Sequence, residues 1–121
     1  MVSTTKKTSF YAMIVRRILP IMVWTTIPVV HASADVLSAI AHCESGGHQY
    51  GPNGEVLRNK INHSVVGLFQ INERLHGAVA RKLGLNIYTP QGNTAYARYL
   101  LQKQGTSPWL ASKKCWKFAQ R

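Results

Sequence analysis

The chain has 121 residues, with 15 Lys and Arg against 4 Asp and Glu, which gives a formal net charge of +11. This length favours one small domain. The positive surplus predicts attraction to polyanions. An acidic polymer of the cell envelope, a nucleic acid and a merely well-solvated surface all remain open at this point.

The N-terminal segment has the layout of a signal peptide. Four cations precede an uncharged run at residues 18–30, and a box of small residues, Ala32-Ser33-Ala34, follows it. The run is shorter than the roughly 20 residues of a membrane span, and two prolines interrupt it. We therefore expect residues 1–34 to be removed as a signal peptide, although a retained anchor is the alternative. The domain would then be residues 35–121, secreted or held in the periplasm or cell envelope, with no stable membrane insertion.

The two cysteines, Cys43 and Cys115, lie near opposite ends of this domain. An exported domain of this size has a modest core and usually needs a covalent link. We expect the two to be paired, with two buried free thiols as the alternative.

The first elements expected along the domain are a helix and a small β element. Four apolar residues recur at helical spacing between residues 35 and 44, and Gly46-Gly47 would end that helix. A Gly51-Pro52-Asn53-Gly54 turn follows. The β-branched stretch at residues 55–71 predicts a hairpin or an extended loop. The apolar residues of the helix are Val36, Leu37, Ile40 and Ala41.

Two further helices and an irregular tail are expected in the second half. Asn72 is a suitable N-cap for a helix ending at Gly84, with Leu75, Val79 and Leu83 forming an apolar row. Another helix is predicted over about 92–104, with its apolar face on Ala95, Tyr96, Tyr99 and Leu100. The tail from Thr106 would be irregular and tied down by Cys115. The fold class expected is mainly α, a small helical domain with a short β-hairpin or extended loop.

Glu44 is the candidate catalytic residue. It follows Ile40 by four positions and Ala41 by three, so it projects from the buried face at the C-terminal end of the helix. Burial and the negative end of the helix dipole both disfavour its charge and raise its pKa. A carboxylic acid that keeps its proton near neutral pH can act as a general acid. A solvated glutamate at a helix end is the alternative.

No metal or other cofactor is expected. His42-Cys43-Glu44 fits half of a zinc deaminase signature, but the half that supplies the other ligands is missing. The His and Cys spacing matches no standard zinc pattern.

Three ordered motifs carry a resemblance to a known family. Glu44-Ser45 after an apolar helix, then residues 67–71 (GLFQI) and residues 93–100 (NTAYARYL), resemble the E-S, G-L-M-Q-I and N-I-x-x-G-x-x-Y-L motifs of soluble lytic transglycosylase (SLT) domains. The CESGG run, with distal Trp109 and Cys115, is also similar to resuscitation-promoting-factor domains of the same lysozyme-like superfamily. Together these similarities cover nearly all of residues 35–116.

The resemblance implies an α+β lysozyme-like fold whose cleft binds peptidoglycan glycan strands and cleaves the MurNAc-GlcNAc β-1,4 bond. Glu44 would be the catalytic acid and base. Gln70 would bind the sugar through its amide, and Gly67 would let the backbone approach it. Tyr99 would lie at the cleft floor, with helix core as the alternative. We expect a monomer. We expect no nucleic-acid partner, because no patch of interleaved aromatic and basic residues accompanies the charge.

The chain departs from the family in one important respect. The A-Y-N-A-G motif, whose tyrosine helps orient the acid in typical transglycosylases, is absent. Tyr96, Tyr99 and Trp109 are candidates to replace that tyrosine. Trp109 is also a candidate for stacking on a sugar, with core packing as the alternative.

Which reaction takes place, hydrolysis or transglycosylation, depends on whether a second carboxylate takes part. A hydrolase normally needs a partner for its acid, and Glu55 is the only candidate, with a solvated acid beside the turn as the alternative. If Glu55 takes no part, a lytic transglycosylase forming 1,6-anhydromuramyl ends is expected. The runners-up are a muramidase using Glu44 and Glu55 and a non-catalytic peptidoglycan-binding module.

Overall fold

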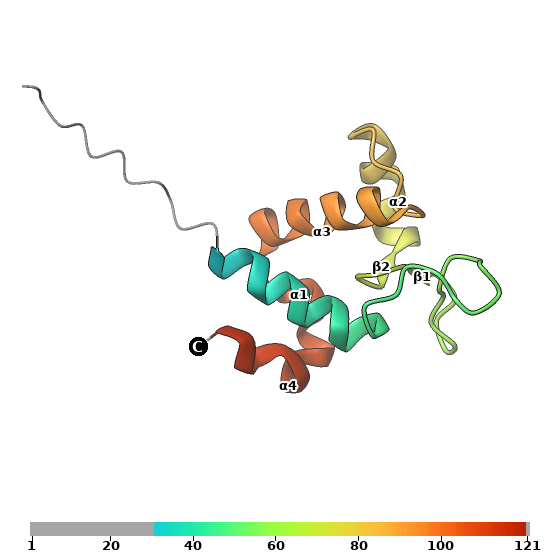
Figure 1. Ribbon diagram of the computed structural model, residues 1–121. Helices are drawn as coiled ribbons and strands as arrows, with labels where there is room; N and C mark the ends of the chain where they lie inside the picture. Colours follow the sequence, from blue (N-terminus) through green and yellow to red (C-terminus); the bar gives the residue numbers. More distant parts are fainter. Residues whose placement is uncertain (1–30, 121) are drawn as a thin grey trace, which may run out of the picture.

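The computed structural model describes residues 31–120, with side chains from Val36 to Phe118. The expected signal peptide, apart from the backbone of residues 31–34, lies outside the described residues. The chain forms a mainly α fold with one small sheet (Figure 1). Its elements are α1 (His31–Ser45), β1 (Val65–Val66), β2 (Ile71–Asn72), α2 (Glu73–Lys82), α3 (Pro90–Gln104), η1 (Ser107–Ser112), α4 (Lys113–Trp116) and η2 (Lys117–Gln120).

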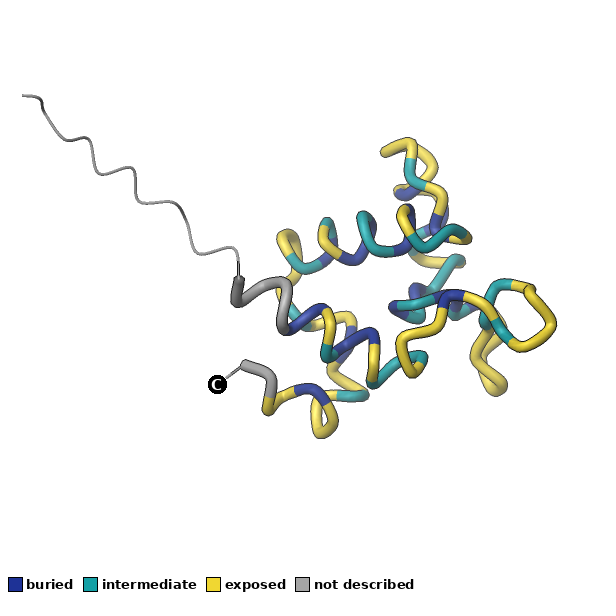
Figure 2. Tube along the Cα trace, in the orientation of Figure 1, coloured by how far each residue is buried: buried dark blue, intermediate teal, exposed yellow. Residues whose placement is uncertain are grey.

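Helix α1 is the central element of the fold. It packs against η1, α4 and η2, and α3 runs on its other side (Figure 1). The four apolar residues predicted to form its buried face are all buried, so this prediction is confirmed. Figure 2 shows buried residues on the inner sides of α1 and α3, whereas the loop between Pro52 and His63 is largely exposed.

The predicted β element is a two-stranded antiparallel sheet. Val65 pairs with Asn72 and Val66 with Ile71. Isolated bridges join Tyr50 to Val56 and Arg58 to Val66, so the preceding loop folds back along β1. The turn at residues 67–70, between β1 and β2, is thereby fixed between the sheet and the helices.

Helix α2 begins as predicted but buries a different side. The side chain of Asn72 accepts a hydrogen bond from the Arg74 N–H, which confirms the N-cap. The expected apolar row is exposed instead, with Leu75 at 71%, Val79 at 40% and Leu83 at 45%. The helix buries Gly77 and Ala80. Small residues allow close packing at the edge of a small core, so the helix turns them inward.

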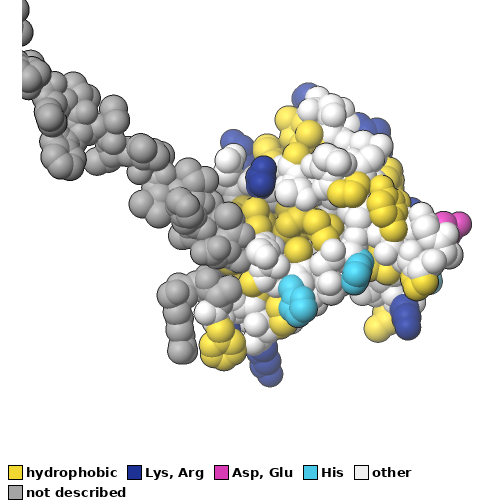
Figure 3. Space-filling model, viewed as in Figure 1, with side chains coloured by type: hydrophobic (Ala, Val, Ile, Leu, Met, Phe, Trp, Pro, Cys, Tyr) yellow, Lys and Arg dark blue, Asp and Glu magenta, His cyan; other side chains and the backbone are white. Residues whose placement is uncertain are grey.

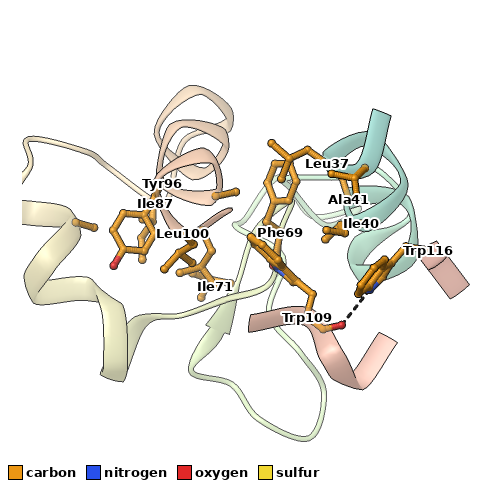
Figure 4. Close-up of a cluster of buried hydrophobic side chains, with 14 residues drawn as sticks. Leu37, Ile40, Ala41, Phe69, Ile71, Ile87, Tyr96, Leu100, Trp109 and Trp116 are labelled. Atoms are coloured by element: carbon orange, nitrogen blue, oxygen red, sulfur yellow. Dashed lines mark hydrogen bonds between the residues drawn. The ribbon is translucent and has the colours of Figure 1, made fainter. Parts of the chain in front are cut away.

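The C-terminal tail is helical rather than irregular, which corrects the sequence-based expectation. Trp109 and Trp116 are 3% and 1% exposed. The Trp109 indole N–H donates to the Phe69 carbonyl at 3.0 Å, and the Trp116 indole N–H donates to the Trp109 carbonyl at 3.0 Å. These side-chain bonds to the backbone fix the short turns of η1 and α4. Figure 4 shows Phe69, Trp109 and Trp116 in the buried cluster with residues of α1.

The disulfide between Cys43 and Cys115 is confirmed, with 6.0 Å between the two Cα atoms. It joins the last turn of α1 to α4. Cys43 lies one residue before Glu44, and Cys115 lies three residues after Ser112. Between residues 31 and 120, no helix is long and apolar enough to cross a membrane.

Candidate active site

Glu44 projects from the last turn of α1 into a cleft of about 500 Å³. The turn before α2 and the first turns of α2 form one wall, and η1 forms another. Apolar side chains at the ends of β2 and α3 contribute to its lining. The residues that line the cleft are Glu44, Val65, Gln70, Ile71, Asn72, Leu75, His76, Leu100, Gln104, Ser107, Pro108, Trp109 and Ala111. Glu44 is the only carboxylate among them.

One hydrogen bond holds the Glu44 carboxyl group. The Ser112 hydroxyl donates to Glu44 Oε1 at 2.5 Å. The same hydroxyl oxygen accepts the indole N–H of Trp116 at 3.1 Å. Sequence reasoning did not identify Ser112, because a single serine in a segment expected to be irregular carries no signal of this contact.

Burial raises the pKa of Glu44 above its usual value, and the hydrogen bond from Ser112 opposes part of that rise. Desolvation is the larger effect, because the half-buried carboxylate loses water that one hydroxyl does not replace. The direction agrees with the prediction from the sequence. Glu44 therefore keeps its proton to a higher pH than an exposed glutamate does, as a general acid requires.

Gly67 lies in the turn between β1 and β2. It is buried, with a φ of 74°, and a Cβ at this position would lie 2.5 Å from the Asn93 amide nitrogen and 2.7 Å from the Gln49 amide. Packing against these two amides explains the glycine without reference to a ligand. Gly67 does not line the cleft, and its role in approaching a sugar remains a prediction from the resemblance.

Asn93 fixes the turn that carries Gln70. Its side chain is fully buried, accepts the Phe69 N–H at 2.9 Å and donates to the carbonyls of Val66 and Ile87. The Asn93 amide thus links α3 to the turn between β1 and β2. This explains in physical terms why an asparagine begins the third motif.

Replacing Asn93 with Ala is expected to lower the free energy of unfolding by about 3 kcal/mol, because the buried Phe69 N–H loses its partner and two carbonyls lose a donor. Urea unfolding followed by circular dichroism measures this change. Asn53→Ala, which removes hydrogen bonds in an exposed turn, serves as the control and should cost less than about 1 kcal/mol. Equal stability of the two variants would contradict this role for Asn93.

Gln70 and Trp109 lie in the cleft with Glu44, as the resemblance implied, but both are also held by the fold. One N–H of the Gln70 amide donates to the Gly67 carbonyl at 2.9 Å, so its second N–H and its amide oxygen are left for a ligand. Trp109 is 3% exposed and tilted against Phe69. This burial favours core packing for Trp109.

Neither of the two tyrosines among the candidates to replace that of A-Y-N-A-G, Tyr96 and Tyr99, is the hydrogen-bond partner of Glu44. The Tyr99 ring lies against Tyr96, and Tyr99 is not among the residues that line the cleft. The Tyr96 hydroxyl lies 3.1 Å from His76 Nδ1. The contact with Glu44 comes from Ser112 instead.

His76 lines the cleft and was not singled out from the sequence. It follows the N-cap of α2 by four positions and faces α3, where its ring lies 5.6 Å from that of Tyr96. Partial burial lowers the pKa of His76, so the ring is neutral near pH 7. A neutral imidazole can donate or accept a hydrogen bond from a sugar.

Glu55 lies outside the cleft. It is exposed and accepts a hydrogen bond from the Asn53 amide at 3.1 Å. Glu73 is held by Arg58 at 2.8 Å and by the Tyr88 hydroxyl at 2.9 Å. Neither carboxylate is brought to Glu44, and the part taken by Glu55 in any reaction remains to be tested.

A second and larger cavity, of about 760 Å³, lies between α1 and α3. Figure 3 shows hydrophobic side chains gathered in the middle of this face. The cavity is lined by Leu37, Ser38, Ala41, His42, Gly47, Leu68, Phe69, Thr94, Arg98, Leu101 and Gln102. Because no carboxylate that could act as a general acid is among them, the cleft at Glu44 is the better candidate for an active site.

No group of three His, Cys, Asp or Glu side chains in the described part of the chain is arranged to hold a metal ion. No family model matches the chain, and no curated protein or solved structure is significantly similar to it.

Proposed function

We propose that this protein cleaves peptidoglycan glycan strands as a lytic transglycosylase of lysozyme-like fold. The observation that carries the proposal is Glu44, the one carboxylate of the cleft, with its pKa raised by burial. Polar groups from Gln70 and His76 lie in the same cleft, beside apolar side chains that suit the faces of sugar rings. The motif resemblance supplies the substrate, a β-1,4-linked polymer of MurNAc and GlcNAc.

The reaction needs one carboxyl group acting twice. Glu44 donates its proton to the glycosidic oxygen, the bond from that oxygen to muramyl C1 breaks, and the GlcNAc chain leaves with a free hydroxyl. The resulting Glu44 carboxylate then takes the proton of the muramyl C6 hydroxyl while O6 bonds to C1. The product is a 1,6-anhydro ring, and Glu44 regains its proton.

The absence of a second carboxylate from the cleft lining favours this route over hydrolysis. A hydrolase needs a second group to activate water or to attack C1. The C6 hydroxyl is part of the same sugar, so its proximity gives it the advantage over a free nucleophile. The muramidase and the non-catalytic binding module remain the alternative proposals.

The surface charge suits a polyanionic partner such as the cell envelope. Within the described residues, Arg58 is the only cation in an ion pair with an acid. The other Lys and Arg side chains there are exposed, so they can attract an acidic polymer at low ionic strength.

A turbidity assay tests the proposal directly. Protein comprising residues 35–121, incubated with purified sacculi, should lower their turbidity and release soluble muropeptides. Binding to sacculi without any release would favour the binding module instead.

A further inference from the structure

The inference concerns Ser112 and rests on the proposed function of Glu44. The Ser112 hydroxyl oxygen lies 2.5 Å from Glu44 Oε1, 3.1 Å from Trp116 Nε1 and 3.2 Å from the Trp109 carbonyl oxygen. The indole N–H can only donate, so it occupies a lone pair of the hydroxyl oxygen. The single hydroxyl proton must then point to Glu44 or to the Trp109 carbonyl, and the contact with Glu44 is much the shorter.

The Trp109 carbonyl does not need that proton. It already accepts the indole N–H of Trp116 at 3.0 Å. Trp116 is 1% exposed, so its indole is held by the core and keeps both contacts in place. The hydroxyl is thereby oriented as a donor toward Glu44 Oε1.

This orientation has a consequence for the protonated form of Glu44. An oxygen that accepts a hydrogen bond from Ser112 is favoured as the carbonyl oxygen of the acid, and the acid proton is favoured on Oε2. Ser112 is not among the residues that line the cleft, whereas Glu44 is. Oε1 is therefore occupied by a contact behind the cleft, and Oε2 is the oxygen left for a substrate.

We propose that Ser112, oriented by Trp116, is a positioning residue that keeps the acid proton of Glu44 on Oε2, the oxygen available to the glycosidic bond. Ser112 thus supplies from the C-terminal segment the support that the A-Y-N-A-G tyrosine supplies in the family the chain resembles. The disulfide maintains this arrangement, because Cys43 precedes Glu44 and Cys115 precedes Trp116 in the sequence.

The other titratable groups around Glu44 do not explain the shift in its pKa. The charged and histidine side chains on the elements packed around the cleft are His42 on α1, Glu73, Arg74, His76, Arg81 and Lys82 on α2, Arg98 and Lys103 on α3, and Lys113, Lys114 and Lys117 on α4 and η2. No ion pair joins any of these described groups to Glu44. Burial and Ser112 are the two causes that shift the pKa of Glu44.

Ser112→Ala, Ser112→Thr and a control, Ser38→Ala, test the proposal. Ser38 is an exposed serine of α1 that does not line the cleft at Glu44. Carbon-13 NMR follows the titration of the Glu44 carboxyl in each protein, and the rate of muropeptide release is measured against pH. The NMR titration requires no activity, so it stays informative if the proposed function fails.

Ser112→Ala should raise the pKa of Glu44 further, because the hydrogen bond that favours the carboxylate is gone. The alkaline limb of the activity profile should move to higher pH, since the active form is the protonated acid. At low pH, where Glu44 is protonated in every variant, Ser112→Ala should still be slower by about 10- to 100-fold with KM unchanged, as expected for a misplaced reacting group. Ser112→Thr should restore both readouts, and Ser38→Ala should match the wild type.

An unchanged Glu44 titration in Ser112→Ala would overturn the hydrogen bond. A shifted titration with full activity at low pH would overturn the positioning role. If the Glu44 titration shifts in Ser112→Ala but the wild-type protein releases no muropeptides, the proposed function is refuted and the hydrogen bond stands.

Discussion

Replacing Glu44 with Gln is expected to abolish the clearing of sacculi, with a loss of at least about 100-fold in the rate of muropeptide release. General acid catalysis contributes about 10² to 10⁴ in rate, and an amide cannot supply the proton. Glu44 is the only carboxylate of the cleft, so no neighbour there can take over. Turbidity and chromatography of the released fragments measure the effect.

The variant should remain folded and bind sacculi. The Gln amide oxygen can accept the hydrogen bond from Ser112 that Glu44 Oε1 accepts now. Glu55→Gln is the matched control, because it makes the same change of charge at an exposed acid. If Glu44→Gln clears sacculi at the rate of that control, Glu44 is not the catalytic acid.

Loss of the Cys43–Cys115 disulfide is expected to have the largest effect on stability. The bond closes a loop with a sequence separation of 72 residues. In the chain-entropy model such a loop is worth about 4 kcal/mol. Reduced protein, or a variant with both cysteines replaced by Ser, should therefore melt roughly 20 °C lower, given the sensitivity of domains of this size.

Differential scanning calorimetry measures the shift in Tm, and peptide mapping without reductant identifies the bond. The double Ser variant should also lose activity below its Tm, because the link that holds the Ser112 segment to Glu44 is gone. A Tm that does not change on reduction would show that the core holds this segment without the disulfide.

The sequence predicted α1, α2 and α3 well because their signals are local, but it missed the short helices of the C-terminal tail. The spacing of Val36, Leu37, Ile40 and Ala41 identified the buried face of α1, and the N-cap at Asn72 with the positive-φ Gly84 just after the helix located α2. The wrong face of α2 was assigned to the core, because the prediction relied on the spacing of large apolar residues. Burial of Gly77 and Ala80 depends on how closely the neighbouring elements approach, which no local pattern records.

The candidate site was predicted only in part, because only some of its residues are identified by local signals. Glu44 was found because burial and helix position can be read from its neighbours along the chain. Ser112 lies 68 positions away and reaches Glu44 through a tail fixed by Trp109 and Trp116. A contact of this kind depends on tertiary packing and on one hydroxyl. The resemblance therefore left Tyr96, Tyr99 and Trp109 as candidates and did not indicate Ser112.

Mass spectrometry of the muropeptides released from sacculi tests the central claim most directly. If Glu44 acts without a second carboxylate, the fragments should carry 1,6-anhydromuramyl ends, lighter by one water than hydrolysis products. Glu55→Gln, with its side chain outside the cleft, should yield the same products at nearly the same rate. Reducing muramyl ends as the main product, together with a large loss of rate in Glu55→Gln, would contradict the account and identify a muramidase.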